Sequence, residues 1–421
     1  MSTSTVETAE FRQELRIRAE GLQPGMFVSA LDRPWLGTGF AFEGVLLRSA
    51  EEVERLRSLC RHVVVDISRG DAPVPAFVEL EAPSAPPAAI AREPVRPGSA
   101  RAFVARVFGR EIAAAEQAHE TLEAGVRDVI DGLRSGGKLD AEKLQQGVDT
   151  MLDSITRHPD ALPWVMEMRR KGDYIYQHGI ACSIWAAAFG RHLGYERDDL
   201  RELALGALLC DVGKVRLPAD LLVKPGPPTD DEIRCLRSHR DESLAIVGAT
   251  PGISAAVRQV VEHHHERHNG SGYPAGVRGS AIPMFARIAG LVDSYDAMVT
   301  QRPYAPGRSP HQAVMELYEA RDTLFQAELV EQFIRTCGVY PTGTLVELSD
   351  GTVGVVMSVN TLKRLRPTVM LLLDADKNPL ADFRLVDLAE VAFDGHGEPL
   401  NVRCGLAQGA YGIDRAALFL D

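Results

Sequence analysis

Two adjacent histidines lie at the centre of the densest group of potential metal ligands in the chain. They are His264 and His265, within the segment EHHHERHNGSGYP at 262–274. Neutral imidazole is the commonest metal ligand in proteins, and the glycines that follow let the backbone approach a ligand closely. The segment therefore indicates metal binding beside a substrate cleft. The alternative interpretation of this segment alone is a solvated cluster of histidines.

Four further polar residues lie within apolar, helix-like segments elsewhere in the central part of the chain. They are His178 in YIYQHGIA, Asp211 in LLCDVGK, His239 in LRSHRDESL and Asp293 in GLVDSYDAM. Any one of them alone would more often be an ordinary core or surface residue. Their number along one helical region indicates a single site instead. A mixed set of histidines and carboxylates suits a first-row metal such as iron or manganese, and a carboxylate can bridge two ions.

The elements that must position these residues are helices. From Phe103 to about Cys337, apolar residues recur at three- and four-residue spacing, as in EIAAAEQAHETLEAGVRDVIDGL and AEKLQQGVDTMLDSI. Residues 11–68 instead mix short strand-like runs, turns and one helical patch. After Gly338, the stretch GTLVELSDGTVGVVMSVN shows two strand-like runs across a Ser-Asp-Gly turn. The pattern predicts a multidomain chain, with a mainly α-helical bundle between a small mixed α/β N-terminal domain and a small β-rich C-terminal domain.

The boundaries of these parts follow from changes in composition. Residues 71–100 are rich in Pro and Ala and lack periodicity, which is typical of a linker. The sequence therefore predicts an N-terminal domain at 1–70, a linker at 71–100, a helical domain at 101–338 and a C-terminal extension at 339–421.

Composition also limits the class of partner and the compartment. The formal net charge of −12 argues against a protein that binds nucleic-acid polymers or membrane surfaces. The six cysteines are scattered without a CxxC pair, which favours reduced thiols in the cytosol. The N-terminus lacks the apolar core of a signal peptide, and no run of about 18 apolar residues is present. We therefore expect a cytoplasmic protein.

The order of the candidate ligands, H…(H)D…H…HH…GYP…D, resembles the HD-GYP family, whose members are bacterial phosphodiesterases that hydrolyse cyclic di-GMP. The resemblance covers roughly residues 103–338, and the block HHERHNGSGYP is its most specific part. The stretches LQPGMFVSALDRPWL and VVVDISRG resemble a small domain of unknown role that often precedes such modules. The ending GVYPTGTLVELSDGTVGVV resembles the β-rich extension that follows many of them. The resemblance thus implies that the central bundle is of the HD type.

The resemblance implies a set of metal ligands, namely His178, Cys210, Asp211, His239, His264, His265 and Asp293. In that scheme Asp211 bridges two divalent ions, iron or manganese. His178, the residue at 210 and Asp293 serve one ion, and the three remaining histidines serve the other. A hydroxide held between the ions would attack the phosphorus in line and release linear pGpG, GMP or both.

The resemblance also implies roles in catalysis and binding. Lys214 would be catalytic and stabilise charge on the phosphate or leaving oxygen, although a lysine here could instead be a partner for a helix dipole. The implied substrate-binding residues are Gly272, Tyr273, Pro274, Arg287 and Arg302. Protein partners could bind the GYP turn or the N-terminal domain. A homodimer through the helix expected at 109–133 is a further hypothesis.

Cys210 departs from the family pattern, which has a histidine before the aspartate. Thiolate binds zinc and iron well, but on an unchanged backbone its sulfur would fall about 2 Å short of the ion. The site could hold two metals with one weakened, hold one metal and be slow, or be inactive. Because six of the seven implied ligands remain, a cyclic di-GMP phosphodiesterase is the favoured prediction. The alternatives are a catalytically degenerate cyclic di-GMP sensor or protein-interaction module, and a phosphohydrolase that acts on mononucleotides or other cyclic dinucleotides.

Overall fold

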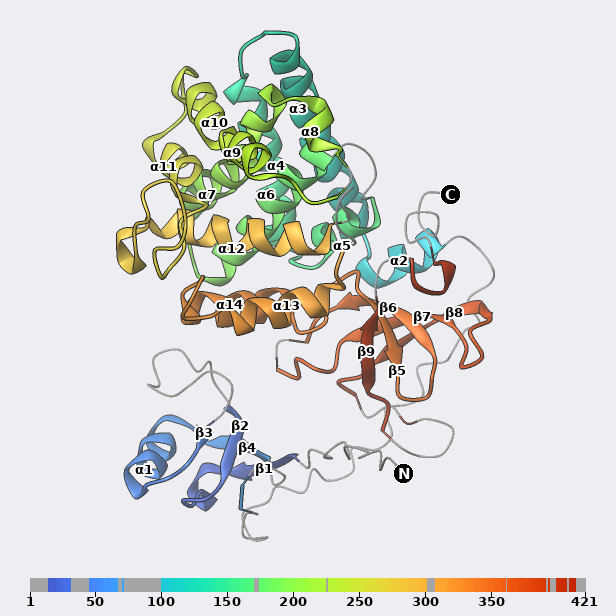
Figure 1. Cartoon of the computed structure of the whole chain (residues 1–421). Coiled ribbons are helices and arrows are strands. Elements are labelled where there is room, and N and C mark those ends of the chain that lie inside the picture. The colour runs from blue at the N-terminus through green and yellow to red at the C-terminus, as the bar shows by residue number, and fades with distance from the viewer. Residues whose placement is uncertain are drawn as a thin grey trace, which may run out of the picture. The chain divides into compact units, whose positions relative to one another are not determined.

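The structure, a computed structural model, forms two compact units, residues 1–93 and 94–421 (Figure 1). It describes residues 14–31, 45–66, 70–71, 100–169, 174–224, 226–300, 307–360, 362–390, 393, 399–406 and 409–413. Almost all of the predicted linker lies outside these residues, as does Arg302. Among the described helices, none combines the length and the hydropathy needed to cross a membrane.

The N-terminal unit contains the expected small mixed α/β domain. Its antiparallel sheet has the strand order β1-β4-β2-β3, formed by β1 (Glu14–Arg18), β2 (Phe27–Leu31), β3 (Val45–Leu46) and β4 (His62–Asp66). One helix, α1 (Ala50–Leu59), begins with a capping box in which Ser49 and Glu52 bond reciprocally to backbone N–H groups. The domain has its own apolar core, which includes Ile17, Leu22, Val28, Leu56 and Val65.

The second unit begins with a long helical region, as the periodicity predicted. Its first helices are α2 (Ala100–Phe108), α3 (Glu111–Arg134), α4 (Ala141–Arg157), α5 (Ala161–Met168), α6 (Tyr174–His192) and α7 (Arg197–Leu209). Helix α6 packs against α7 and α12, and its residues 180–189 are all buried. A helix that is apolar on every side belongs inside a bundle, which agrees with this central place.

Shorter helices follow and complete the bundle. They are the 3-10 turn η3 (Val212–Arg216), α8 (Ala219–Leu222), α9 (Asp230–Arg237), α10 (His239–Gly248), α11 (Ala255–His263), the 3-10 turn η4 (Gly279–Ala281), α12 (Met284–Val299), α13 (Pro310–Glu319) and α14 (Ala327–Cys337). Several begin at capping side chains, such as Thr229 before α9 and Ser309 before α13. These caps define where the chain leaves each loop.

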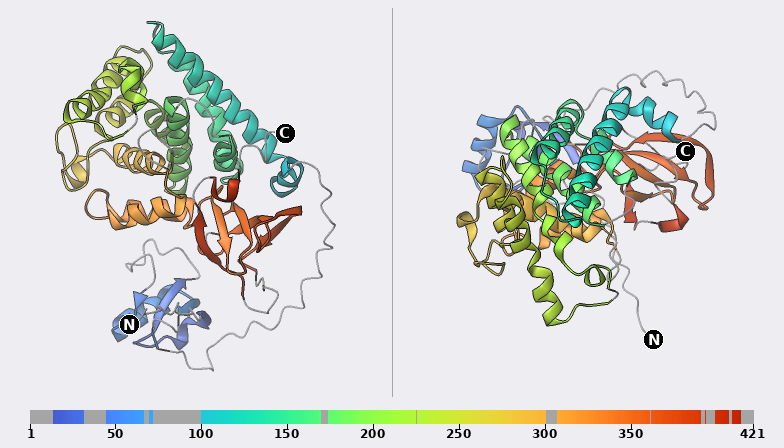
Figure 2. Two further views of the ribbon diagram at one scale, coloured as in Figure 1. Left: turned by 45° about the vertical axis from the view of Figure 1, so that its right-hand side comes forward. Right: turned by 90° about the horizontal axis from the view of Figure 1, so that it is seen from above.

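A five-stranded antiparallel sheet completes the second unit, with the strand order β8-β7-β6-β5-β9. The strands are β5 (Leu345–Leu348), β6 (Val353–Ser358), β7 (Thr368–Leu373), β8 (Pro379–Asp387) and β9 (Val402–Leu406). The predicted hairpin is present, because β5 and β6 pair around the Ser-Asp-Gly turn. Leu345, Val355 and Met370 join the core of the helices, whereas Val346 and Val356 belong to a separate core. In Figure 2 this sheet lies beside α13, which contacts β9.

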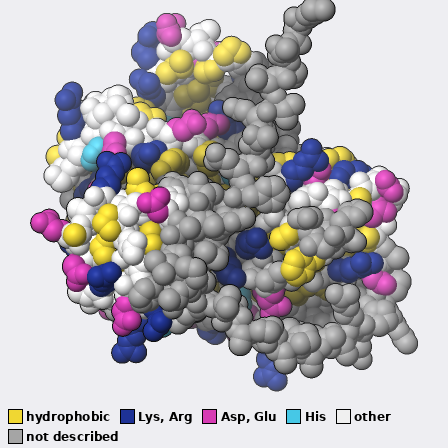
Figure 3. All heavy atoms as spheres, turned by 90° about the horizontal axis from the view of Figure 1, so that it is seen from below, with side chains coloured by type: hydrophobic (Ala, Val, Ile, Leu, Met, Phe, Trp, Pro, Cys, Tyr) yellow, Lys and Arg dark blue, Asp and Glu magenta, His cyan; other side chains and the backbone are white. Residues whose placement is uncertain are grey.

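Charged side chains of both signs are interspersed over the described surface of the face shown in Figure 3. That distribution agrees with the moderate acidity of the whole chain, whose 58 acidic residues exceed its 46 Lys and Arg residues.

Candidate metal centre

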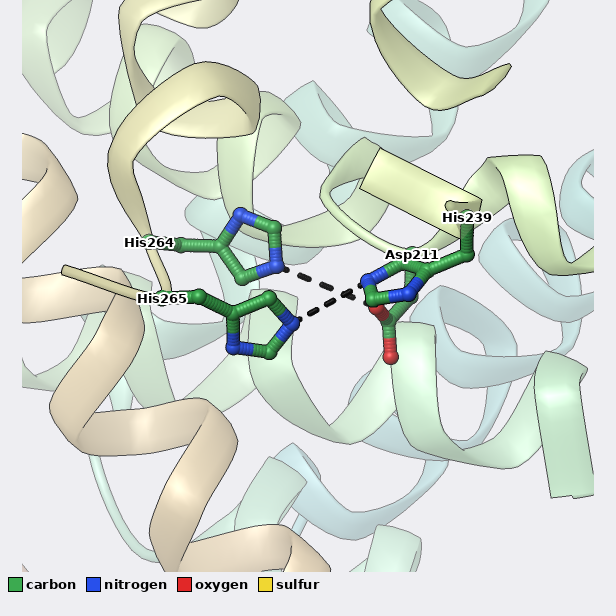
Figure 4. A group of neighbouring side chains, drawn as sticks. All are labelled: Asp211, His239, His264 and His265. Carbon is green, nitrogen blue, oxygen red and sulfur yellow. Dashed lines mark hydrogen bonds and ion pairs between the residues drawn. The ribbon is translucent and has the colours of Figure 1, made fainter. Parts of the chain in front are cut away.

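Six of the seven ligand positions predicted from the sequence lie close together in the bundle, in or directly after five helices. His178 is in α6, Asp211 follows α7, His239 begins α10, His264 and His265 follow α11, and Asp293 is in α12. Four of them form one group of potential ligands, the three-histidine group, made of Asp211, His239, His264 and His265 (Figure 4). The other two belong to a second group, the His178 group, made of His178, Cys182 and Asp293.

Two glycines allow these elements to approach closely enough. A Cβ atom at Gly213 in η3 would lie 2.1 Å from the carbonyl oxygen of His239. A Cβ atom at Gly290 in α12 would lie 2.2 Å from the carbonyl oxygen of His264. Neither separation is sterically possible, so only glycine permits these contacts. The first brings the start of α10 next to Asp211, and the second brings α12 against the end of α11.

The nitrogen and oxygen atoms of the three-histidine group converge. Nε2 of His239 lies 2.9 Å from Oδ1 of Asp211 and 3.1 Å from Nε2 of His265. Nε2 of His264 lies 3.8 Å from the same Asp211 oxygen. The His264 side chain is 0% exposed, yet this nitrogen has no hydrogen-bond partner among the described residues. A buried polar atom without a partner is costly, which indicates that something else satisfies it.

The backbone fixes which nitrogen of two histidines carries a proton. Nδ1 of His239 donates to the carbonyl oxygen of Leu236 at 2.6 Å, and Nδ1 of His264 donates to that of Val261 at 3.0 Å. In the neutral imidazole, Nε2 then has a lone pair, and it faces Asp211 in both cases. Such an arrangement of lone pairs suits a cation at the centre. Protonating all three histidines would place like charges together, whereas a divalent ion satisfies every lone pair.

The pKa values of this group favour the forms that bind metal. Burial opposes ionisation of Asp211, but the ammonium of Lys214 and the neighbouring imidazoles outweigh it and hold its pKa well below the usual range. Burial, followed by the charge of His264, holds the pKa of His265 well below its usual value. At neutral pH, Asp211 is therefore ionised and His265 is neutral, as metal ligation requires.

The His178 group lies on the other side of Asp211. Nε2 of His178 is 2.9 Å from Oδ1 of Asp293 and 3.2 Å from Oδ2 of Asp211. Its Nδ1 lies 2.6 Å from Oδ2 of Asp296, a buried carboxylate that orients the ring. A carboxylate behind a histidine is the usual support of a metal-binding imidazole. Burial opposes ionisation of Asp293, but the hydrogen bond from His178 and the charges of the nearby imidazoles lower its pKa below the usual range.

The sequence reasoning missed two residues of this region, Cys182 and Asp296. Cys182 lies four residues after His178 on α6, and its Sγ is 3.8 Å from Nε2 of that histidine. Asp296 lies three residues after Asp293 on α12. Residues three or four apart share one face of a helix, so their spacing from His178 and Asp293 would have indicated both residues.

Cys210 belongs to neither group. It follows α7 in helical conformation, and its thiol donates back to the carbonyl oxygen of Ala207 at 3.2 Å. Burial, followed by the negative charge of Asp211, raises the pKa of this thiol well above its ordinary value. Metal ligation by Cys210 stays a prediction.

The residues predicted to contact substrate have different surroundings. The Tyr273 ring stacks on His265 with centroids 4.7 Å apart, next to Gly272 and Pro274 in the same turn. Lys214 contacts Oδ2 of Asp211. Arg287 lies elsewhere on α12, where it donates to Oε1 of Gln326 at 2.5 Å and lines a small pocket with Glu266 and His268. The roles of these residues in binding stay predictions.

Comparison with known proteins adds three family matches. An HD domain matches residues 159–329, a domain of unknown function (DUF3391) matches 14–144, and a KOW domain associated with HD domains matches 345–392. The HD-domain match contains every residue of both ligand groups.

Similar proteins are known over most of the chain. The chain is 32% identical over 376 residues to the cyclic di-GMP phosphodiesterase PA4108 of Pseudomonas aeruginosa, covering 89% of this chain and 88% of that protein. It is 32% identical over 167 residues to the response regulator and cyclic di-GMP phosphodiesterase RpfG of Xanthomonas campestris, covering 38% and 44%. Among solved structures, an HDG"Y"P protein from Bdellovibrio bacteriovorus, Bd1817, matches with a TM-score of 0.45 and 16% identity, covering 76% of this chain and 98% of that one.

Proposed function

The chain belongs to the HD-GYP family of HD-domain cyclic di-GMP phosphodiesterases, and on that premise we propose that it hydrolyses cyclic di-GMP at a site for two divalent ions. The position of the Asp211 carboxylate carries the proposal. Its Oδ1 faces His239 and His264, at 2.9 and 3.8 Å, and its Oδ2 faces His178 at 3.2 Å. One carboxylate with one oxygen toward each ligand group is the arrangement that a bridging ligand requires.

The donor set suggests the metal. Nitrogen and oxygen donors in a mixed set suit iron or manganese, and we propose two such ions, one for each ligand group. When bound, the ions would polarise phosphoryl oxygens and lower the pKa of a coordinated water toward neutrality. Without that positive charge, the ionised Asp211 and Asp293 would repel the phosphate of a substrate.

The protein's own residues would hold and orient the substrate. Lys214 contacts Asp211 and adds a positive charge next to the carboxylates, where charge builds up on the phosphate or leaving oxygen. The Tyr273 ring covers one side of His265, and the guanidinium of Arg237 lies 4.8 Å from the centroid of the same ring. An aromatic ring beside a phosphate site can stack with a nucleobase. We propose that the GYP turn forms one wall of the cleft and that the products are pGpG, GMP or both.

A hydrolysis assay tests this proposal. The full-length chain is purified without oxygen, stripped of metal, loaded with Fe(II) or Mn(II) and mixed with cyclic di-GMP, and the products are separated by chromatography. We expect linear pGpG or GMP from the loaded chain and none from the stripped chain. Parallel reactions with other cyclic dinucleotides test substrate specificity. If no loaded form consumes cyclic di-GMP, the proposal is wrong.

The position of Cys210 supports a second candidate function, a module that binds cyclic di-GMP without hydrolysing it. Its thiol donates to the carbonyl oxygen of Ala207, and Cys210 is in neither group of converging ligand atoms among the described residues. The variant Cys210→His separates the two candidates. An inactive native chain and an active variant would identify the native protein as a binding module, whereas turnover by the native chain would favour the enzyme.

A further inference from the structure

Cys182 has a position in the site that the predicted ligand set does not assign. It is 0% exposed and lies one turn after His178 on α6. Its Sγ is 3.8 Å from Nε2 and 3.9 Å from Nδ1 of His178, and this thiol has no other hydrogen-bond partner among the described residues. One ligand atom each from His178, Cys182 and Asp293 lie within 4.8 Å of one another.

The separation of these atoms suits two donors on one ion. Imidazole nitrogen binds a zinc-like ion at about 2.1 Å and thiolate sulfur at about 2.3 Å, so the two atoms lie about 3.6 Å apart in a tetrahedral site. The observed 3.8 Å between Cys182 Sγ and His178 Nε2 is close to this value, but Sγ is also 3.9 Å from Nδ1 and therefore lies beside the ring. A rotation of the Cys182 side chain about its Cα–Cβ bond is needed to bring Sγ to an ion on Nε2. Both residues are on one helix, so their separation depends only on local geometry.

Cys210 provides the contrast. It stands at the position where the family has a histidine, but its thiol donates to Ala207 at 3.2 Å within its own helical turn. It is absent from the groups of residues whose ligand atoms converge. Of the two buried cysteines near Asp211, only Cys182 shares such a group with His178 and Asp293.

We propose that Cys182 is a thiolate ligand of the ion in the His178 group, where it supplies the donor that position 210 does not. The inference rests on the two-ion site proposed above. When the ion binds, the S–H bond breaks, a sulfur–metal bond forms and the proton leaves to solvent. Sulfur is a softer donor than imidazole or carboxylate, so this position selects iron, cobalt or zinc over manganese.

Cobalt(II) loading tests this directly. The full-length chain is stripped of metal and titrated with cobalt(II) without oxygen, and ultraviolet absorption is followed. Ligation by thiolate gives a thiolate-to-cobalt charge-transfer band in this region, whereas ligation by imidazole or carboxylate gives no such band. We expect the band in the native chain and in Cys210→Ala. We expect its loss in Cys182→Ala. The same substitution should weaken cobalt or zinc binding more than about tenfold, and manganese binding much less, since only the softer ions gain from sulfur.

X-ray absorption of the native cobalt-loaded chain avoids any substitution and should show a sulfur neighbour at about 2.3 Å. A band that survives in Cys182→Ala and disappears in Cys210→Ala would assign the thiolate to Cys210 and overturn the inference. Bound cobalt without a sulfur neighbour would make Cys182 a small core residue and also overturn it. If the chain binds no cobalt, both this inference and the proposed two-ion site are wrong. A thiolate band without hydrolysis of cyclic di-GMP would leave the ligand in place and reject the proposed activity.

Discussion

The two ligand groups of the candidate centre are positioned in different ways. The three-histidine group takes all four of its side chains from the ends of helices, where Gly213 and Gly290 let neighbouring backbone approach. The His178 group takes its side chains from the interior of α6 and α12, two packed helices of the bundle. Residues at the ends of helices can shift with the adjoining loops, whereas residues inside packed helices are held by their neighbours. We therefore expect the His178 group to be the more rigid half and the three-histidine group the more adjustable half.

Asp211→Asn removes the carboxylate that contacts both groups and should have the largest effect. The amide keeps the shape but loses the charge that compensates two cations. Because metal ions contribute several kcal/mol to phosphoryl transfer, we expect cyclic di-GMP turnover to fall by at least about 1,000-fold. Turnover is measured with saturating metal, and circular dichroism checks the fold. The matched control is Asp241→Asn, an exposed carboxylate on α10 that pairs with Arg240 and should leave turnover unchanged. Activity close to the native value in Asp211→Asn would remove its bridging role.

His264→Ala removes a ligand from the three-histidine group only, so it distinguishes metal binding by that group from metal binding by the His178 group. It deletes the buried nitrogen that has no partner among the described residues. We expect the bound metal to fall from about two ions to about one per chain, and turnover to fall by about 100-fold or more, because one ion loses a direct ligand. Metal content is measured after gel filtration. The neighbouring His263→Ala is the control, since that side chain is partly exposed and belongs to neither group. Loss of both ions in His264→Ala would show that the groups do not bind independently.

Asp296→Asn tests the support of the His178 group. The amide oxygen can still accept the Nδ1 proton of His178, so the ring keeps its direction but loses the charge behind it. We expect metal affinity to fall by about tenfold, with turnover largely recovered at high metal concentration. That recovery distinguishes a positioning residue from one that contacts substrate. A loss of turnover that added metal does not restore would contradict the positioning role.

The sequence predicted the candidate site better where a motif spans several residues than where one isolated side chain is a candidate ligand. The adjacent histidines and the Asp293 region stand out because polar residues interrupt apolar helices. Cys182 does not stand out, because a cysteine inside YIYQHGIACSIWAAAFG has the same hydropathy as its neighbours. The direction of the Cys210 thiol depends on how the chain leaves α7, which local composition does not encode. Likewise, the C-terminal strands were predicted, but their packing against the helices depends on contacts distant in sequence.

A buried histidine outside the site, His119, can be compared with the buried His264 of the three-histidine group. Its substitution should have the smallest effect on activity. His119 on α3 is 0% exposed, and neither ring nitrogen has a hydrogen-bond partner among the described residues. Unlike His264, it is not part of a group of converging ligands. Burial, only partly offset by Glu123, lowers its pKa from 6.5 to about 4. A buried histidine is thus a candidate metal ligand only where the ligand atoms of other side chains lie close to it.

This difference predicts a pH effect on stability and none on turnover. Between pH 6.5 and about 4 the unfolded chain binds a proton at His119 that the folded chain does not, so the free energy of unfolding falls as the pH falls. At pH 5 the contribution is about 2 kcal/mol relative to neutral pH. His119→Leu removes the titrating group, so urea unfolding at pH 5 and pH 7.5 should differ by about 2 kcal/mol less than in the native chain. Turnover and metal content at pH 7.5 should match the native values. An unchanged pH dependence of unfolding would mean that His119 is protonated in the folded chain, and a loss of metal would place it in the site after all.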